Sequence, residues 1–114
     1  MTIQLDKVLK ARVVNEVRVR FPRIECVDGF SLSVQTGNGM YCEPRPEFPE
    51  DGELIGPFVS AEIGFPNARP EPWDVWEEYC EQPDSPTRTV YGYVPAEIIR
   101  ALIELHGGEK GDGE

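Results

Sequence analysis

The sequence predicts a small α+β domain, with an antiparallel sheet of three or four strands and two or three helices packed on one face. Asp28-Gly29 separates two short runs of alternating apolar residues, which is typical of a β-hairpin. Two later segments, 58–65 and 87–94, have the apolar, β-branched and aromatic composition of strands. Pro72 and Pro95 each open a stretch with helical spacing, because proline is tolerated in the first turn of a helix.

The length of 114 residues indicates a single domain, which we place at residues 1–108. The last six residues, EKGDGE, are predicted to be a disordered tail, 109–114. No run approaches the length of a membrane span, and no leader sequence opens the chain. We therefore expect neither a membrane protein nor a secreted one.

Three cysteines, Cys26, Cys42 and Cys80, are an odd number at spacings unlike a disulfide framework or a CxxC zinc site. Together with His106 they could offer four metal ligands, but nothing in the spacing favours this. We expect free thiols in a reducing cytoplasm, and neither a metal nor a cofactor.

The net charge of −10 is unevenly distributed along the chain. Residues 1–23 form a basic segment with six basic and two acidic residues, a net charge of +4. The remaining residues have five basic and 19 acidic side chains, a net charge of −14. Because an acidic body repels phosphate backbones, direct binding of nucleic acid by the whole domain is disfavoured. The charge fits a protein partner with a basic surface.

The basic segment is predicted to form a helix from about residue 4 to 12, where Leu5, Val8 and Leu9 follow helical spacing. Residues 13–21 are left open between helix and strand, because Val17 to Phe21 alternates like a strand. Pro22 ends whichever element precedes it.

The register of the hairpin follows from side-chain parity. A three-residue loop, 27–29, pairs Cys26 with Phe30 and Ile24 with Leu32, and it places every apolar residue of both strands on one face. A two-residue loop would divide them between the two faces. We therefore predict the three-residue loop, with Gly29 in the left-handed region.

The segment after the hairpin, TGNGMYCEPRP, is predicted to be a loop, because its glycines and prolines disfavour helix and central strand. Tyr41 and Arg45 on this loop are candidate binding residues. The alternative is that Tyr41 closes the core and Arg45 pairs with a carboxylate. Residues 43–57 form a proline-rich acidic excursion in which we expect little regular structure.

The helix that Pro72 opens is predicted to run from Trp73 to about Glu81. Its apolar side chains fall on one side of the helical wheel: Trp73, Val75, Trp76, Tyr79 and Cys80. Its acids fall on the other side: Asp74, Glu77, Glu78 and Glu81. Like charges at these spacings cost a few tenths of a kcal/mol per pair, and no cation offsets them. We expect these acids to form a binding surface, with Trp73 or Tyr41 as an apolar anchor. The alternative is a solvated outer face over a tryptophan core.

The last helix is predicted to run from Pro95 to His106 and to end at Gly107-Gly108. Its buried stripe is predicted to consist of Ile98, Ala101, Leu102 and Leu105, with Ile99 alongside. His106 in the last turn interacts favourably with the helix dipole.

Four segments resemble a pattern found in small uncharacterised proteins of tailed bacteriophages: DGFSLSVQ, YCEPR, AEIGFP and VYGYVPAEIIRALIELHGG. Those proteins pair a DGFS-V-Q hairpin and a YC-PR loop with a terminal GYVP helix that ends in HGG. The resemblance covers roughly Pro22 to Gly108 and implies a phage protein expressed in the bacterial cytoplasm. It carries over no catalytic residues. Small acidic phage proteins of this kind often take part in host takeover by antagonising host enzymes or defence systems, and some are anti-CRISPR proteins that mimic nucleic-acid charge.

These observations favour a non-enzymatic binding protein that inhibits a host or defence protein through its acidic side. One alternative is a nucleic-acid-associated or virion-assembly protein that uses the basic segment. Another is a cysteine-dependent enzyme with Cys42 as nucleophile, Arg45 lowering its pKa and His106 as base. No catalytic motif in the sequence favours this second alternative.

Overall fold

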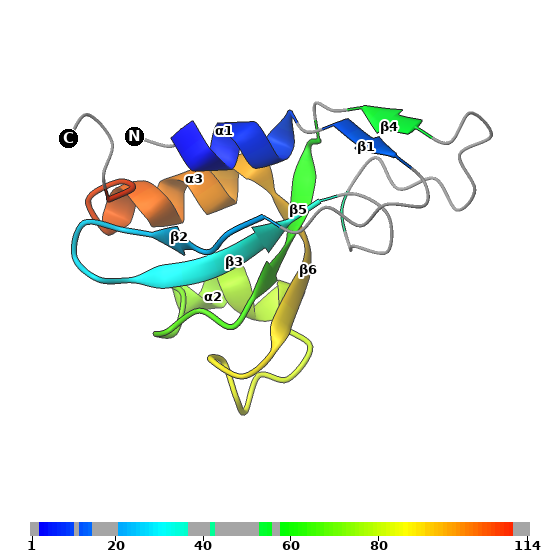
Figure 1. Cartoon of the computed structure of the whole chain (residues 1–114). Coiled ribbons are helices and arrows are strands. Elements are labelled where there is room, and N and C mark those ends of the chain that lie inside the picture. The colour runs from blue at the N-terminus through cyan, green and yellow to red at the C-terminus, as the bar shows by residue number, and fades with distance from the viewer. Residues whose placement is uncertain are drawn as a thin grey trace.

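Four antiparallel strands form the central sheet of the computed structural model, in the order β2-β3-β5-β6 (Figure 1). Their bounds are β2 (Ile24–Glu25), β3 (Ser31–Gln35), β5 (Ser60–Gly64) and β6 (Val90–Pro95). The structure describes residues 3–10, 12–14, 21–36, 42, 53–55 and 58–110. The predicted α+β class and the strand number are therefore confirmed.

The hairpin has the predicted register, with Ile24 opposite Leu32 and the Cys26 amide donating to the Phe30 carbonyl at 2.7 Å. Gly29 has φ +97°, in the region that favours glycine. The apolar residues of both strands are buried: Ile24, Cys26, Phe30, Leu32 and Val34. The parity argument is therefore confirmed.

A second pair of strands lies apart from the sheet, where β1 (Arg12–Val14) pairs antiparallel with β4 (Glu53–Ile55). The sequence left residues 13–21 open between helix and strand, and the structure shows strand at Val13 and Val14. Residues 15–20 lie outside the described residues. The expectation of little regular structure in 43–57 is wrong at β4. Its partner lies some forty residues earlier in the chain, and no local pattern reveals such a pairing.

Three short helices pack their apolar side chains into one core with the sheet: α1 (Ile3–Leu9), α2 (Trp73–Trp76) and α3 (Ala96–Leu105). A 3₁₀ turn, η1 (Glu77–Tyr79), continues α2. The helical segment ends earlier than predicted because Cys80 adopts an extended conformation and bridges to Tyr91 on β6. None of the helices in the described ranges combines the length and apolar character of a membrane span.

The buried face of α3 agrees with the predicted one only in part. Ile99 and Leu102 are buried as predicted and Ile103 is buried as well, whereas Ala101 is exposed and Leu105 is 62% exposed. Apolar residues cover more than half of this helix's circumference, so the wheel permits more than one rotation. At the start of the helix, directly after β6, the Ala96 amide donates to the Val59 carbonyl at 3.0 Å.

The C-terminal prediction also requires a correction, because Glu109 is only 6% exposed and Lys110 is held to the sheet. The Lys110 amide donates to the Glu25 carbonyl at 2.7 Å. The Glu109 carboxylate accepts hydrogen bonds from the backbone amides of Gln4 and Leu5 at 2.7 and 3.0 Å. The predicted disordered tail therefore does not begin at residue 109, and residues 111–114 lie outside the described part.

Candidate functional site

Two tryptophans anchor the α2–η1 segment to the core. Trp76 is 1% exposed and meets the Tyr91 ring edge-on, with centroids 5.7 Å apart. Trp73 is half-buried and approaches Tyr91 at 6.4 Å. The Trp73 amide donates to the Glu71 carboxylate at 3.0 Å, and the Arg69 guanidinium lies 5.4 Å from the Trp73 ring centroid. These contacts hold the segment in one orientation on the domain.

The side chains of Asp74, Glu77, Glu78 and Glu81 are exposed and together form what we call the acidic surface. They do not lie on one helical stripe as predicted. Asp74 belongs to α2 and the next two to η1, whereas Glu81 follows the helical segment and donates its amide to the Val90 carbonyl at 3.1 Å. Within the described residues, no ion pair of 4.0 Å or less joins any of the four to a cation.

Glu97 adds a further acidic side chain, on α3, which the sequence did not predict. The pKa of Tyr79 is raised first by desolvation and then by the negative charges of Glu78 and Glu97. Glu97 is exposed at the first turn of α3. An acid in the first turn of a helix interacts favourably with the helix dipole.

Arg69, a cation beside this segment, is already paired. Its guanidinium donates to the Glu71 carboxylate at 2.8 Å, and this pair lowers the pKa of Glu71. Arg69 therefore neutralises Glu71 and forms no ion pair with the acidic surface in the described part of the chain.

The loop candidates Tyr41 and Arg45 lie outside the described residues. Cys42 between them is described and is fully buried. Because a nucleophilic thiol needs access to its substrate, this burial argues against the cysteine chemistry considered above. Cys26 is also buried, and burial together with the charges of Asp28 and Glu109 raises its pKa to about 11.

His106 is part of a contact between the hairpin turn and the end of α3. Its Nδ1 lies 2.7 Å from the Asp28 carboxylate, and its ring stacks on Phe30 with centroids 4.0 Å apart. Its Nε2 is buried without a hydrogen-bond partner. A catalytic base must reach the proton it removes, and this ring offers no accessible nitrogen for that purpose. Cys42 does not line the small hollow of about 280 Å³ beside His106.

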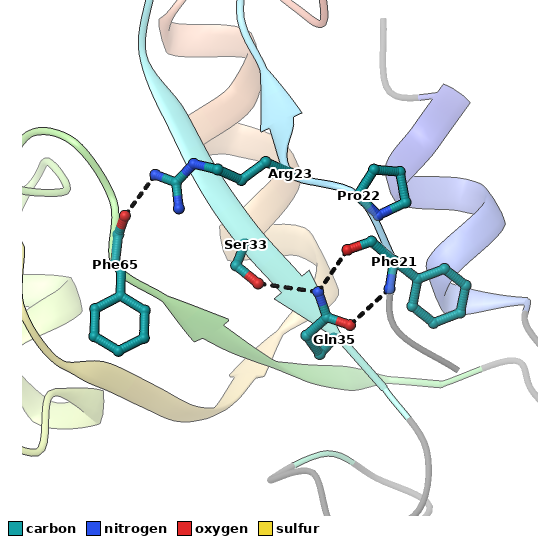
Figure 2. A pocket seen from close by; sticks show the side chains of 6 residues that line it. All are labelled: Phe21, Pro22, Arg23, Ser33, Gln35 and Phe65. Atoms are coloured by element: carbon teal, nitrogen blue, oxygen red, sulfur yellow. Dashed lines mark hydrogen bonds between the residues drawn. The ribbon is translucent and has the colours of Figure 1, made fainter. Parts of the chain in front are cut away.

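A second hollow, of about 540 Å³, lies on the sheet face turned away from the core (Figure 2). Its lining consists of Phe21, Pro22, Arg23, Ser33, Gln35 and Phe65. The Gln35 amide is bonded to both backbone groups of Phe21, at 2.9 and 2.8 Å. Arg23 donates to Ser31 and to the Phe65 carbonyl. The polar groups of this hollow therefore hold the chain before β2 against the sheet.

Comparisons with known proteins give no further indication of function. No protein-family model matches the chain, and no curated protein or solved structure is significantly similar to it. Within the part of the chain that the structure describes, no group of three or more histidine, cysteine or acidic side chains could hold a metal ion.

Proposed function

We propose that this protein is a non-enzymatic binding protein that docks its acidic surface on a basic surface of another protein. The observation that carries this proposal is a set of exposed carboxylates on a segment that Trp73 and Trp76 anchor to the core; among the described residues, no ion pair of 4.0 Å or less involves them. A rigid array of one charge attracts partners of the opposite charge and increases their association rate.

The resemblance to phage proteins supports a partner in the bacterial cytoplasm. A phage protein of this charge would inhibit a host or defence protein by occupying a site that otherwise binds nucleic acid, as anti-CRISPR proteins of the nucleic-acid-mimicking type do. The net charge of −10 fits such mimicry, because phosphate backbones present the same sign of charge.

The alternative function assigns nucleic-acid binding or virion assembly to the basic segment. Lys7 and Lys10 are exposed at α1, whereas Arg23 donates its hydrogen bonds to Ser31 and Phe65. A gel shift at low salt that is lost when Lys7 and Lys10 become alanine would favour this alternative over the acidic surface.

Capture from a bacterial lysate, quantified by mass spectrometry, tests the proposal. Glu77→Lys and Glu78→Lys should each weaken capture of the specific partner by roughly threefold to tenfold, because each variant replaces an attraction with a repulsion. The matched control is Glu25→Lys, which makes the same change of charge at an exposed residue of β2. If partner capture falls equally in all three variants, or falls in none of them, a role for the acidic surface is refuted.

A further inference from the structure

One flank of α3 carries apolar side chains that the fold leaves uncovered. Ile98 is half-buried, Ala101 is exposed and Leu105 is 62% exposed. Their spacing of three and four residues places them along a single side of the helix, which we call the α3 flank. The helix already buries Ile99, Leu102 and Ile103 in the core, so the flank is a second apolar side.

The hairpin turn presents a further exposed apolar side chain near the C-terminal end of α3. Val27 is 64% exposed, and its amide donates to the Gly108 carbonyl at 3.0 Å. A Cβ atom on Gly107 would lie 3.3 Å from the Cβ of Val27, so the two backbones are in close contact. Figure 1 shows the β2–β3 turn beside this end of α3. Neighbouring exposed aliphatic side chains of this kind mark interaction surfaces.

Negative charge borders the flank at its other end. Glu97 precedes Ile98 and lies one helical turn from Ala101. Within the described residues, Glu97 has no ion pair of 4.0 Å or less. Arg100 lies on the opposite side of the helix, where its guanidinium binds Asp6 at 2.9 Å. The flank is therefore apolar with an anionic border.

From this arrangement we infer that the α3 flank is the docking site for a positively charged amphipathic helix of the partner protein. The inference rests on the proposed function and names the chemistry of its partner. Ten residues of α3 extend about 15 Å, so a partner helix of about three turns covers the flank. Its apolar side chains contact Ala101 and Leu105, and its lysines or arginines face Glu97.

Charge complementarity distinguishes this occupant from others. A second copy of the chain would bring another net charge of −10 to the same border, and a nucleic acid or an anionic membrane would bring phosphates. Only a cationic partner with apolar side chains matches both parts of the surface.

The test uses two synthetic peptides of about four helical turns with the same lysine and leucine composition. One arranges its leucines along one helical face, and the other has them scrambled. Binding to the ¹⁵N-labelled full chain is followed by amide chemical shifts. We expect the amphipathic peptide to bind about tenfold more tightly and to shift Ala101, Leu105 and Val27. Leu105→Ser should weaken binding of the amphipathic peptide by about tenfold. Phe65→Ser, which removes an exposed apolar side chain on the other face of the sheet, should leave this binding unchanged.

The outcomes separate this inference from the proposed function. Equal binding of both peptides, unchanged by Leu105→Ser but weakened by Glu77→Lys, would overturn the docking site and leave the acidic surface as a binding site. Binding of neither peptide would overturn the docking site, while lysate capture that still depends on Glu77 would retain the proposed function. Sedimentation of the free chain as a dimer that Leu105→Ser dissociates would show that a second copy occupies the flank, and would also overturn the inference.

Discussion

Glu109 joins the two ends of the described chain through a single side chain. Both of its carboxylate oxygens accept backbone amides of the first turn of α1, at 2.7 and 3.0 Å. The first amides of a helix have no partner within the helix, and a negative charge there is favourable. A carboxylate supplied from the C-terminal end of the domain thus performs the task of a local capping residue.

We predict that Glu109→Ala lowers the free energy of unfolding by about 1–2 kcal/mol, because two amides lose their acceptor. Glu109→Gln should cost less, since its amide oxygen can still accept one bond. Urea denaturation measures both effects, with Glu25→Ala as the control at an exposed position. If Glu109→Ala is as stable as the wild type, the two hydrogen bonds of Glu109 contribute nothing to the stability of the fold.

Asp28 makes the acid stability of the fold depend on one exposed carboxyl group. The Phe30 amide donates to it at 3.0 Å, and the His106 ring binds it at 2.7 Å; these two hydrogen bonds lower its pKa below the ordinary value of 3.8. A carboxyl group whose pKa is lower in the folded state stabilises the fold above its unfolded pKa. That stabilisation is lost as the pH falls through the folded pKa.

We therefore predict that Asp28→Asn is less stable than the wild type near neutral pH, and that the difference shrinks as the pH falls below the ordinary carboxyl pKa of 3.8. Unfolding curves at a series of pH values measure this dependence. Asp84→Asn makes the same chemical change at another exposed carboxyl group and serves as the control. A constant difference between Asp28→Asn and the wild type at every pH would contradict the prediction.

At the scale of elements, the hairpin shows how turn chemistry and side-chain parity agree. Gly29 closes the turn at φ +97°, and its amide donates to the Cys26 carbonyl at 3.0 Å. Nothing lies within 4 Å of the place that a Cβ would take. A substitution there therefore tests backbone conformation alone, without a steric clash.

We predict that Gly29→Ala lowers the free energy of unfolding by about 1 kcal/mol. Gly29→Asn should cost less, because asparagine tolerates positive φ better than alanine does. Thermal or urea unfolding of the two variants measures their order of stability. Equal stability of Gly29→Ala and the wild type would mean that the turn relaxes to another conformation.

The α2–η1 segment combines a buried anchor with an exposed charge array within seven residues. Trp76 and Tyr91 fix its position from the core side, while Asp74, Glu77 and Glu78 face solvent. The segment is too short to be a stable helix by itself, so tertiary contacts must hold it. The exposed acidic side chains can therefore be substituted without loss of the Trp76–Tyr91 contact that anchors the segment.

At the scale of the whole molecule, the charge distribution opposes stability while it favours the proposed docking. Glu77 and Glu78 lie among other carboxylates without a cation in the described residues to offset them. Repulsion within such a group weakens the folded state and is screened by salt. Residues retained at a cost to stability are those expected at a binding surface.

We predict that Glu77→Gln and Glu78→Gln each raise the free energy of unfolding by a few tenths of a kcal/mol at low salt while they weaken partner capture. This gain in stability over the wild type should shrink as the salt concentration increases. Salt screens the repulsion between carboxylates in the wild type, so the variants then have less repulsion to relieve. Urea denaturation at two salt concentrations measures this change. A loss of stability in both variants would show that the glutamates serve the fold.

The sequence by itself determined the features that depend on neighbouring residues. The register of the hairpin follows from the alternation around Asp28-Gly29, and the opposition of Trp76 to Glu77 and Glu78 follows from their spacing. Gly107 and Gly108 end α3 with positive φ, as their type predicts. Turn chemistry and periodicity act over a few residues, and those residues are visible in the sequence.

The tertiary structure alone decided which side of α3 is buried and where Glu109 binds. Apolar residues cover more than half of the circumference of α3, so its sequence pattern permits more than one rotation. The contact from Glu109 to Leu5 spans 104 positions of the chain. Such contacts depend on the packing of whole elements, and local side-chain patterns carry no information about it.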